Sequence, residues 1–89
     1  MICMMAVYTV GADEIRVNKM RSVAEAWGFA GKYEGPERLL QDAKKKRFDM
    51  VLVVDLEAID EKIKKELATL NVEIINLNDK KKLEKLVKI

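Results

Sequence analysis

Four acidic residues follow directly after an apolar segment in the middle of the chain. Residues 50–54 read Met-Val-Leu-Val-Val, and the acids behind them are Asp55, Glu57, Asp60 and Glu61. Carboxylate oxygens are the ligands that Mg²⁺ prefers, and a carboxylate can also accept a phosphoryl group. We expect no resident metal and no cofactor, and Asp55 and Glu57 are the residues that would hold a metal if the protein bound one.

A second group that could bind a ligand consists of three consecutive lysines, Lys80, Lys81 and Lys82. They open the last predicted helix, where positive charge interacts unfavourably with the helix dipole. A solvated surface explains them, and the alternative is a contact with an anion or with nucleic-acid phosphates. The net charge of +2 is too small to predict a strongly basic binder. We therefore expect at most weak DNA binding, through these three lysines.

Four apolar segments predict the strands that would position these groups. The first strand ends at Val10, the second lies within 28–35, the third is 50–54 and the fourth is 72–77. The glycines of the second segment weaken strand pairing, so we expect it at an edge of the sheet. The third segment is continuously apolar, which is typical of a parallel strand covered on both faces.

Polar and apolar residues alternate at helical spacing between these strands. Asp13 and Pro36 mark the starts of the first two helices, Gly28 ends the first, Asn71 ends the third and Asp79 begins the last. The inward-facing residues of the four helices are expected to be Met20, Val23, Ala24 and Trp27, then Leu39, Leu40 and Ala43, then Ile59, Ile63, Leu67 and Leu70, and finally Leu83, Leu86 and Val87.

Strands that alternate with helices pair in parallel through right-handed crossovers. The sequence therefore predicts an α/β fold, with residues 1–89 forming one domain. In a sheet of this kind ligands bind beyond the carboxyl ends of the strands. Any functional site is expected at that edge, near Gly11, Asp55 and Asn78.

The composition favours a heat-adapted cytoplasmic protein. Charged residues make up 36% of the chain, with 17 Lys and Arg against 15 Asp and Glu, and surface ion-pair networks of this kind are typical of thermophiles. The single Cys3 cannot form an internal disulfide, and the lack of His excludes the common zinc-finger ligand sets. No segment approaches the ~20 apolar residues that span a bilayer, so we expect no membrane partner.

Four segments resemble the catalytic domain of serine recombinases, the resolvase/invertase family. They read AVYTVGADE (6–14), AWGFAGKYEG (26–35), ERLLQDAKKKRFDMVLV (37–53) and LATLNVEIINLND (67–79). The third is the most specific, because the family uses a helix that ends in basic residues, then Phe-Asp and a valine-rich strand. The resemblance implies a flavodoxin-like (Rossmann-like) doubly wound parallel sheet of about four strands in the order 2-1-3-4, with helices on both faces.

The chain departs from that family at the positions that carry the family's chemistry. The nucleophilic serine falls on Gly11 and two arginines fall on Ala58 and Glu61, and we call these three the vestigial positions. Phosphoryl transfer to serine needs the hydroxyl and the arginines that neutralise the phosphate, so we assign no catalytic residue. The resemblance implies a catalytically inactive resolvase-like domain, an interaction or regulatory module related to DNA recombination or mobile elements. Its expected partner is a second copy or a related recombinase.

A second resemblance keeps a signalling alternative open. FDMVLVVDLE (48–57) is similar to the third strand of a response-regulator receiver, with Asp55 at the phospho-acceptor position. Receivers carry an acid pair directly after the first strand, whereas Asp13 and Glu14 lie beyond Gly11 at a helix start, where capping explains them. The proline expected after the acceptor is absent. This alternative is a truncated receiver-like site for a phosphoryl group and Mg²⁺ at Asp55.

Overall fold

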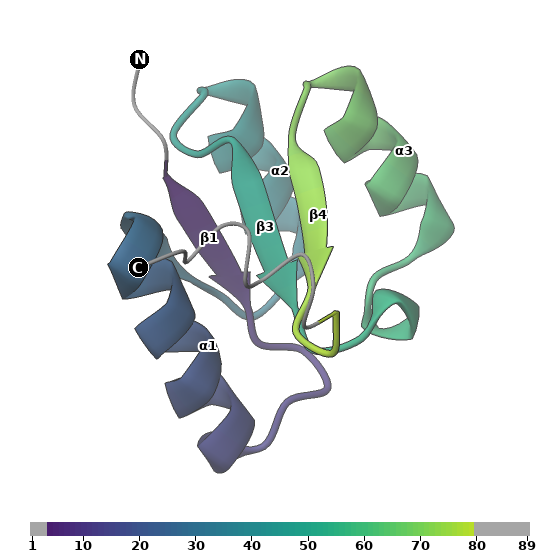
Figure 1. The fold of residues 1–89 in the computed structure, drawn as a ribbon. Coiled ribbons are helices and arrows are strands. Elements are labelled where there is room, and N and C mark those ends of the chain that lie inside the picture. Colours follow the sequence, from purple (N-terminus) through teal and green to yellow (C-terminus); the bar gives the residue numbers. More distant parts are fainter. Residues whose placement is uncertain (1–3, 80–89) are drawn as a thin grey trace.

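A computed structural model describes residues 4–79 of the chain (Figure 1). Strands and helices alternate along it, as the sequence predicts. The elements are β1 (Met5–Tyr8), α1 (Glu14–Trp27), β2 (Phe29–Tyr33), α2 (Pro36–Lys44), β3 (Met50–Val53), the short 3₁₀ helix η1 (Leu56–Ala58), α3 (Glu61–Thr69) and β4 (Glu73–Asn76). The predicted last helix, with Leu83, Leu86 and Val87, lies outside the described residues.

The four strands form one parallel sheet in the order β2-β1-β3-β4. In this sheet Met5 of β1 lies opposite Met50 of β3, and Met50 lies opposite Glu73 of β4. The order reverses direction between β1 and β3, which makes this pair the topological switch point of the sheet. The predicted α/β class and the 2-1-3-4 order are confirmed, and they agree with a flavodoxin-like fold.

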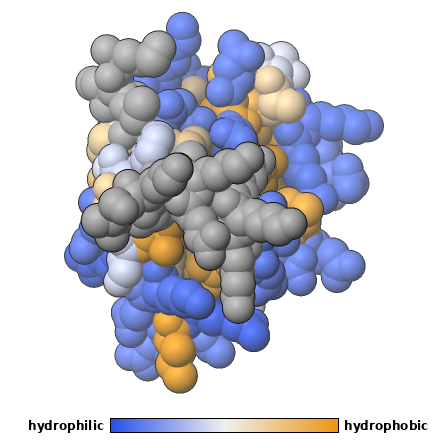
Figure 2. Space-filling model, viewed as in Figure 1, coloured by the Kyte–Doolittle hydropathy of each residue, from blue (hydrophilic) through white to orange (hydrophobic). Residues whose placement is uncertain are grey.

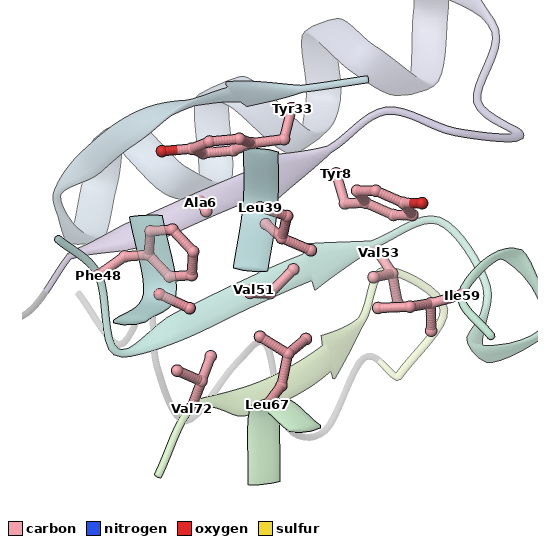
Figure 3. Close-up of a cluster of buried hydrophobic side chains, with 11 residues drawn as sticks. Ala6, Tyr8, Tyr33, Leu39, Phe48, Val51, Val53, Ile59, Leu67 and Val72 are labelled. Carbon is pink, nitrogen blue, oxygen red and sulfur yellow. The ribbon is translucent and has the colours of Figure 1, made fainter. Parts of the chain in front are cut away.

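Helices cover both faces of the sheet, and two hydrophobic clusters fill the spaces between them. On one face α1 packs Met20 and Ala24 over Met5 and Val7. On the other face α2 and α3 pack against each other and against the opposite sides of the same strands. Figure 3 shows this second cluster, whose buried members are Ala6, Tyr8, Tyr33, Leu39, Ala43, Phe48, Val51, Val53, Ile59, Leu67 and Val72. In the view of Figure 2 the described surface is mostly hydrophilic.

The residues that begin and end the helices are those expected from local chemistry. Asp13 caps α1, because its Oδ1 accepts a hydrogen bond of 2.8 Å from the Arg16 backbone N–H. Gly28 ends α1 with φ 147°, and Pro36 begins α2. Asn71 follows α3 with φ 62°, the left-handed conformation that stops a helix. Asp13, Gly28, Pro36 and Asn71 therefore mark these helix ends as the sequence predicts.

Strand β2 lies at one edge of the sheet, as predicted. Its Gly31 has φ 144°, and the register with β1 shifts between Met5 and Ala6. Lys32 is exposed, while the next residue, Tyr33, is buried at the end of the strand. The edge is therefore irregular and carries a positive charge.

A hydrogen bond joins β2 to α2. The Tyr33 hydroxyl donates to Asp42 Oδ2 at 2.6 Å, and the Tyr33 and Phe48 rings lie 5.5 Å apart between centroids. Arg47 Nε lies 3.8 Å from Asp42 Oδ1. Burial, together with the Asp42 carboxylate, raises the pKa of Tyr33 from 10.0 to about 12, because a phenolate there would lose hydration and face a negative charge.

Two local features differ from what the sequence suggests. The 3₁₀ helix η1 precedes α3, so Ile59 lies between the two helices and its side chain is buried. The spacing along α3 suggests i,i+4 ion pairs, Asp60 with Lys64 among them. In the described residues the ion pair of α3 instead joins Lys64 Nζ to Glu61 Oε1 at 3.2 Å, an i,i+3 spacing. Asp60 is the N-cap of α3 and lies before its first turn, so Glu61 is the acid that pairs with Lys64.

Candidate functional site

The loops that follow β1 and β3 touch each other at the switch point. Gly11, after β1, has φ 80°, and a Cβ placed on it would lie 3.4 Å from Ala58 Cβ and 3.6 Å from Val54 Cγ1. Ala58 closes η1 and Val54 follows β3 directly. Small and apolar groups therefore occupy the position where a doubly wound sheet usually holds its ligand.

The structure brings two of the three vestigial positions together. Gly11 and Ala58 face each other across this contact, although they are far apart in the sequence. Glu61 is the first residue of α3, and its carboxylate pairs with Lys64 Nζ at 3.2 Å. The pair at positions 11 and 58 offers neither a hydroxyl nor a cation, the two groups that phosphoryl transfer to serine requires.

The hydroxyls of Thr9 and Ser22, the two candidate aliphatic nucleophiles near the first strand and helix, each donate a hydrogen bond to a backbone carbonyl oxygen. The Thr9 hydroxyl donates to the Tyr33 carbonyl oxygen at 3.3 Å, and the Thr9 backbone N–H donates to the same oxygen at 2.9 Å. The Ser22 hydroxyl lies on the exposed side of α1 and donates to the Asn18 carbonyl oxygen at 3.0 Å. The Thr9 hydroxyl therefore bonds to the neighbouring strand β2, and the Ser22 hydroxyl bonds one turn back within α1.

Two of the acidic residues that the sequence singles out cap helices at the edge of the sheet where the strands end. Asp55 is the N-cap of η1, and its Oδ1 accepts a hydrogen bond of 3.3 Å from the Glu57 backbone N–H. The Glu57 side chain is exposed, and Asp13 caps α1. Within residues 4–79 no three His, Cys, Asp or Glu side chains gather closely enough to hold a metal ion. Among the described residues, Asp55 and Glu57 thus have no third side chain of these types close enough to complete such a group.

Two asparagines form hydrogen bonds where β3 and β4 end. The Asn78 side-chain N–H₂ donates to the Val54 carbonyl oxygen at 3.3 Å, and its backbone N–H donates to Asn76 Oδ1 at 2.9 Å. These bonds fasten the end of β4 to the chain that leaves β3. The remaining lysines of interest, Lys80, Lys81 and Lys82, and the thiol of Cys3 lie outside the described residues.

Two exposed hydrophobic side chains stand at the same edge. Ile15, in the first turn of α1, is 80% exposed, and Leu56, in η1, is 42% exposed. Figure 2 shows a hydrophobic spot among hydrophilic residues at the lower end of α1. Our sequence interpretation missed both residues. The available signal was periodicity, since Ile15 lies off the stripe that contains Met20 and Ala24.

The edge that carries these side chains is acidic. Residues 9–16 and 54–62 contain six carboxylates and two cations. The acids are Asp13, Glu14, Asp55, Glu57, Asp60 and Glu61, and the cations are Arg16 and Lys62. This excess of negative charge repels phosphate groups and attracts basic surfaces.

The chain matches no protein-family model, no curated protein and no solved structure. The resemblance to serine recombinases and the one to receivers therefore remain predictions from the residues quoted above. Within residues 4–79 no helix is both long and apolar enough to cross a membrane.

Two open hollows lie elsewhere on the surface. One, of about 340 Å³, is formed at the start of α2 by Gly35, Pro36, Glu37, Arg38 and Gln41. The other, of about 220 Å³, lies between the ends of α2 and α3 and is lined by Lys44, Glu66, Thr69 and Leu70. Neither of these two hollows includes a vestigial position.

Proposed function

We propose that this chain is a non-catalytic domain of serine-recombinase ancestry that acts by binding another protein. The contact between Gly11 and Ala58 carries the proposal. A recombinase would place its nucleophile and an arginine at these two positions. Here position 11 has no side chain and position 58 has only a methyl group, and an ideal Cβ at residue 11 would lie 3.4 Å from Ala58 Cβ, in van der Waals contact.

In this proposal the binding surface is the carboxyl edge, which is the edge of the sheet where the parallel strands end. Ile15 and Leu56 are the large hydrophobic side chains that residues 4–79 leave exposed, and both belong to this edge. In the proposed complex these two side chains are the apolar contacts and the charged residues around them form the rim, as in a typical protein interface. The surrounding carboxylates favour a partner that combines basic side chains with an apolar anchor.

The same charge decides between the two expected partners. Two copies of the chain that met edge to edge would bring six carboxylates of one copy against six of the other, which repel. A related recombinase with a basic contact surface would be attracted instead. We therefore propose a recombinase or another mobile-element protein as the partner, in the cytoplasm.

The direct test is titration calorimetry with a purified serine-recombinase catalytic domain as the probe. Ile15→Asp and Leu56→Asp should each weaken binding about tenfold or more, because each places a charge at an apolar contact. Ala68→Asp adds the same charge on the exposed surface of α3 and serves as the matched control, with no change expected. Binding should also weaken as salt concentration rises.

Three results would contradict the proposal. One is undetectable binding of the probe at low salt, and another is equal affinity of the Ile15→Asp, Leu56→Asp and Ala68→Asp variants. The third is a covalent adduct between the wild-type chain and DNA. Sedimentation of the chain alone, over a range of concentrations, separates self-association from binding to the probe.

A further inference from the structure

The connection from α2 to β3 carries a group of exposed cations. Lys44 is the last residue of α2, Lys45 is its C-cap, and Lys46 and Arg47 follow. All four are exposed, and we call residues 44–47 the basic turn. It lies at the end of the sheet where the strands begin, opposite the acidic carboxyl edge (Figure 1).

The end of α2 does not require these charged side chains. Backbone N–H groups of the turn bond the last carbonyl oxygens of the helix at 3.0–3.3 Å. The donors are Lys45, Lys46 and Arg47, and the acceptors are Gln41, Ala43 and Asp42. Any residue other than proline supplies such a donor. A cation also interacts favourably with a helix C-terminus, but this effect is confined to the last turn. It therefore explains Lys44 better than the residues that follow it.

The backbone of Lys46 makes a lysine unfavourable at this position. Lys46 has φ 57°, the left-handed conformation that glycine and asparagine adopt most readily at the ends of helices. The other two α-helices follow that preference, since Gly28 ends α1 and Asn71 follows α3. Residues held in such conformations cluster at functional sites. The lysine therefore suggests a use for its charge outside the fold.

Acids of the same chain leave most of this charge available. Arg47 Nε lies 3.8 Å from Asp42 Oδ1, and the Arg47 side chain stays 62% exposed. Lys44 lines the hollow of about 220 Å³, which also contains Glu66. Within residues 4–79 no ion pair involves the two lysines between Lys44 and Arg47. These two lysines are therefore the strongest candidates for contact with an external anion.

We propose that the basic turn binds the phosphate backbone of a nucleic acid, with Lys45 and Lys46 in contact with phosphates. Such contacts need cations and no apolar surface, whereas the core of a protein interface is apolar. The large hydrophobic side chains that residues 4–79 leave exposed, Ile15 and Leu56, both belong to the carboxyl edge. The basic turn therefore fits a nucleic acid better than an acidic protein. This site is separate from the three lysines singled out in the sequence, and it does not depend on the protein partner proposed above.

Fluorescence anisotropy with a short labelled DNA duplex of random sequence measures the binding. The wild-type chain should bind with a Kd of about 1–100 μM, and its affinity should fall as salt concentration rises. Lys45→Glu should weaken binding about threefold or more and reduce the slope of log affinity against log salt by about one. Lys19→Glu makes the same change of charge on the exposed surface of α1 and serves as the matched control, with affinity close to wild type.

A second variant, Lys46→Gly, separates binding from folding. Glycine adopts φ 57° without strain, so this variant should raise Tm by about 2–8 °C. It should also weaken DNA binding about twofold or more, because a phosphate contact is lost. A lysine that served only the fold would give no loss of affinity.

Three results would overturn the proposal. The first is undetectable binding of the duplex at low salt. The second is equal affinity of the Lys45→Glu, Lys46→Gly and Lys19→Glu variants for the duplex. In the third, polyglutamate displaces the duplex at an equal concentration of charge, which would assign the basic turn to an acidic protein instead.

Discussion

Gly11→Ser tests the strain and the chemistry of the switch point in one variant. Gly11 has φ 80°, a conformation that side chains other than Asn and Asp rarely adopt. The strain amounts to about 1–2 kcal/mol. The space itself is adequate, since the new Cβ would meet Ala58 Cβ at 3.4 Å and Val54 Cγ1 at 3.6 Å. The cost therefore comes from the backbone and not from a clash.

This cost is a measurable share of the stability of a small domain. A chain of 89 residues has a free energy of unfolding of about 4–13 kcal/mol. A loss of 1–2 kcal/mol lowers Tm by about 4–16 °C in a domain of this size. Thermal unfolding followed by circular dichroism measures it. Gly35→Ser is the matched control, because Gly35 has φ −153° and no heavy atom within 4 Å of its Cβ position. It caps α2, so Ser there should keep or slightly raise Tm.

The same variant restores the hydroxyl that a serine recombinase uses. Incubation with supercoiled DNA, followed by denaturing gels, should still give no covalent adduct, because Ala58 supplies no cation beside it. An unchanged Tm for Gly11→Ser would refute the assignment of backbone strain to this turn. A covalent adduct would refute the argument that the lost arginine at position 58 by itself prevents this chemistry, whatever the change in Tm.

Two further predictions concern Tyr33 and Asp55. Tyr33→Phe should cost about 1.5–3 kcal/mol, because it removes a hydrogen bond to the Asp42 carboxylate. With a pKa of about 12 in the folded state and 10.0 as its ordinary value, Tyr33 contributes stability that is present below pH 10 and is lost as pH rises toward 12. The stability difference between wild type and Tyr33→Phe should therefore shrink over that range in urea titrations, and a constant difference would show that the hydroxyl does not titrate as described. Millimolar Mg²⁺ should leave Tm unchanged. Asp55→Asn should retain the cap on η1. Asp55→Ala should remove it and lower the free energy of unfolding by about 0.5–1 kcal/mol. A rise in Tm with Mg²⁺ that Asp55→Asn abolishes would support the receiver-like alternative instead.

Much of the fold could be predicted because its determinants are local. Asp13, Gly28 and Pro36 act through a few neighbouring backbone groups, so their effect is visible in a short window of sequence. The apolar run 50–54 indicates a strand buried on both faces without reference to its neighbours. Their alternation then leads to a parallel sheet, and the resemblance supplied the strand order.

The candidate site was less predictable because it depends on distant residues. Only the resemblance paired Gly11 with Ala58, and no pattern in the sequence shows that their loops touch. The role of Asp55 was obscured by η1, whose three residues are too few to show a helical period. The bond between Tyr33 and Asp42 joins a strand to a helix, and neither residue reveals its partner from spacing alone.

The irregular edge strand β2 also bears on how the protein behaves at high concentration. An exposed strand edge can pair with the edge of another molecule and begin an aggregate. The unusual backbone at Gly31 and the register shift beside Met5 disturb the regular hydrogen-bond ladder, and the charge of Lys32 opposes a second strand that carries the same residue. These three features therefore oppose the addition of a further strand beside β2 in the four-stranded sheet of residues 4–79.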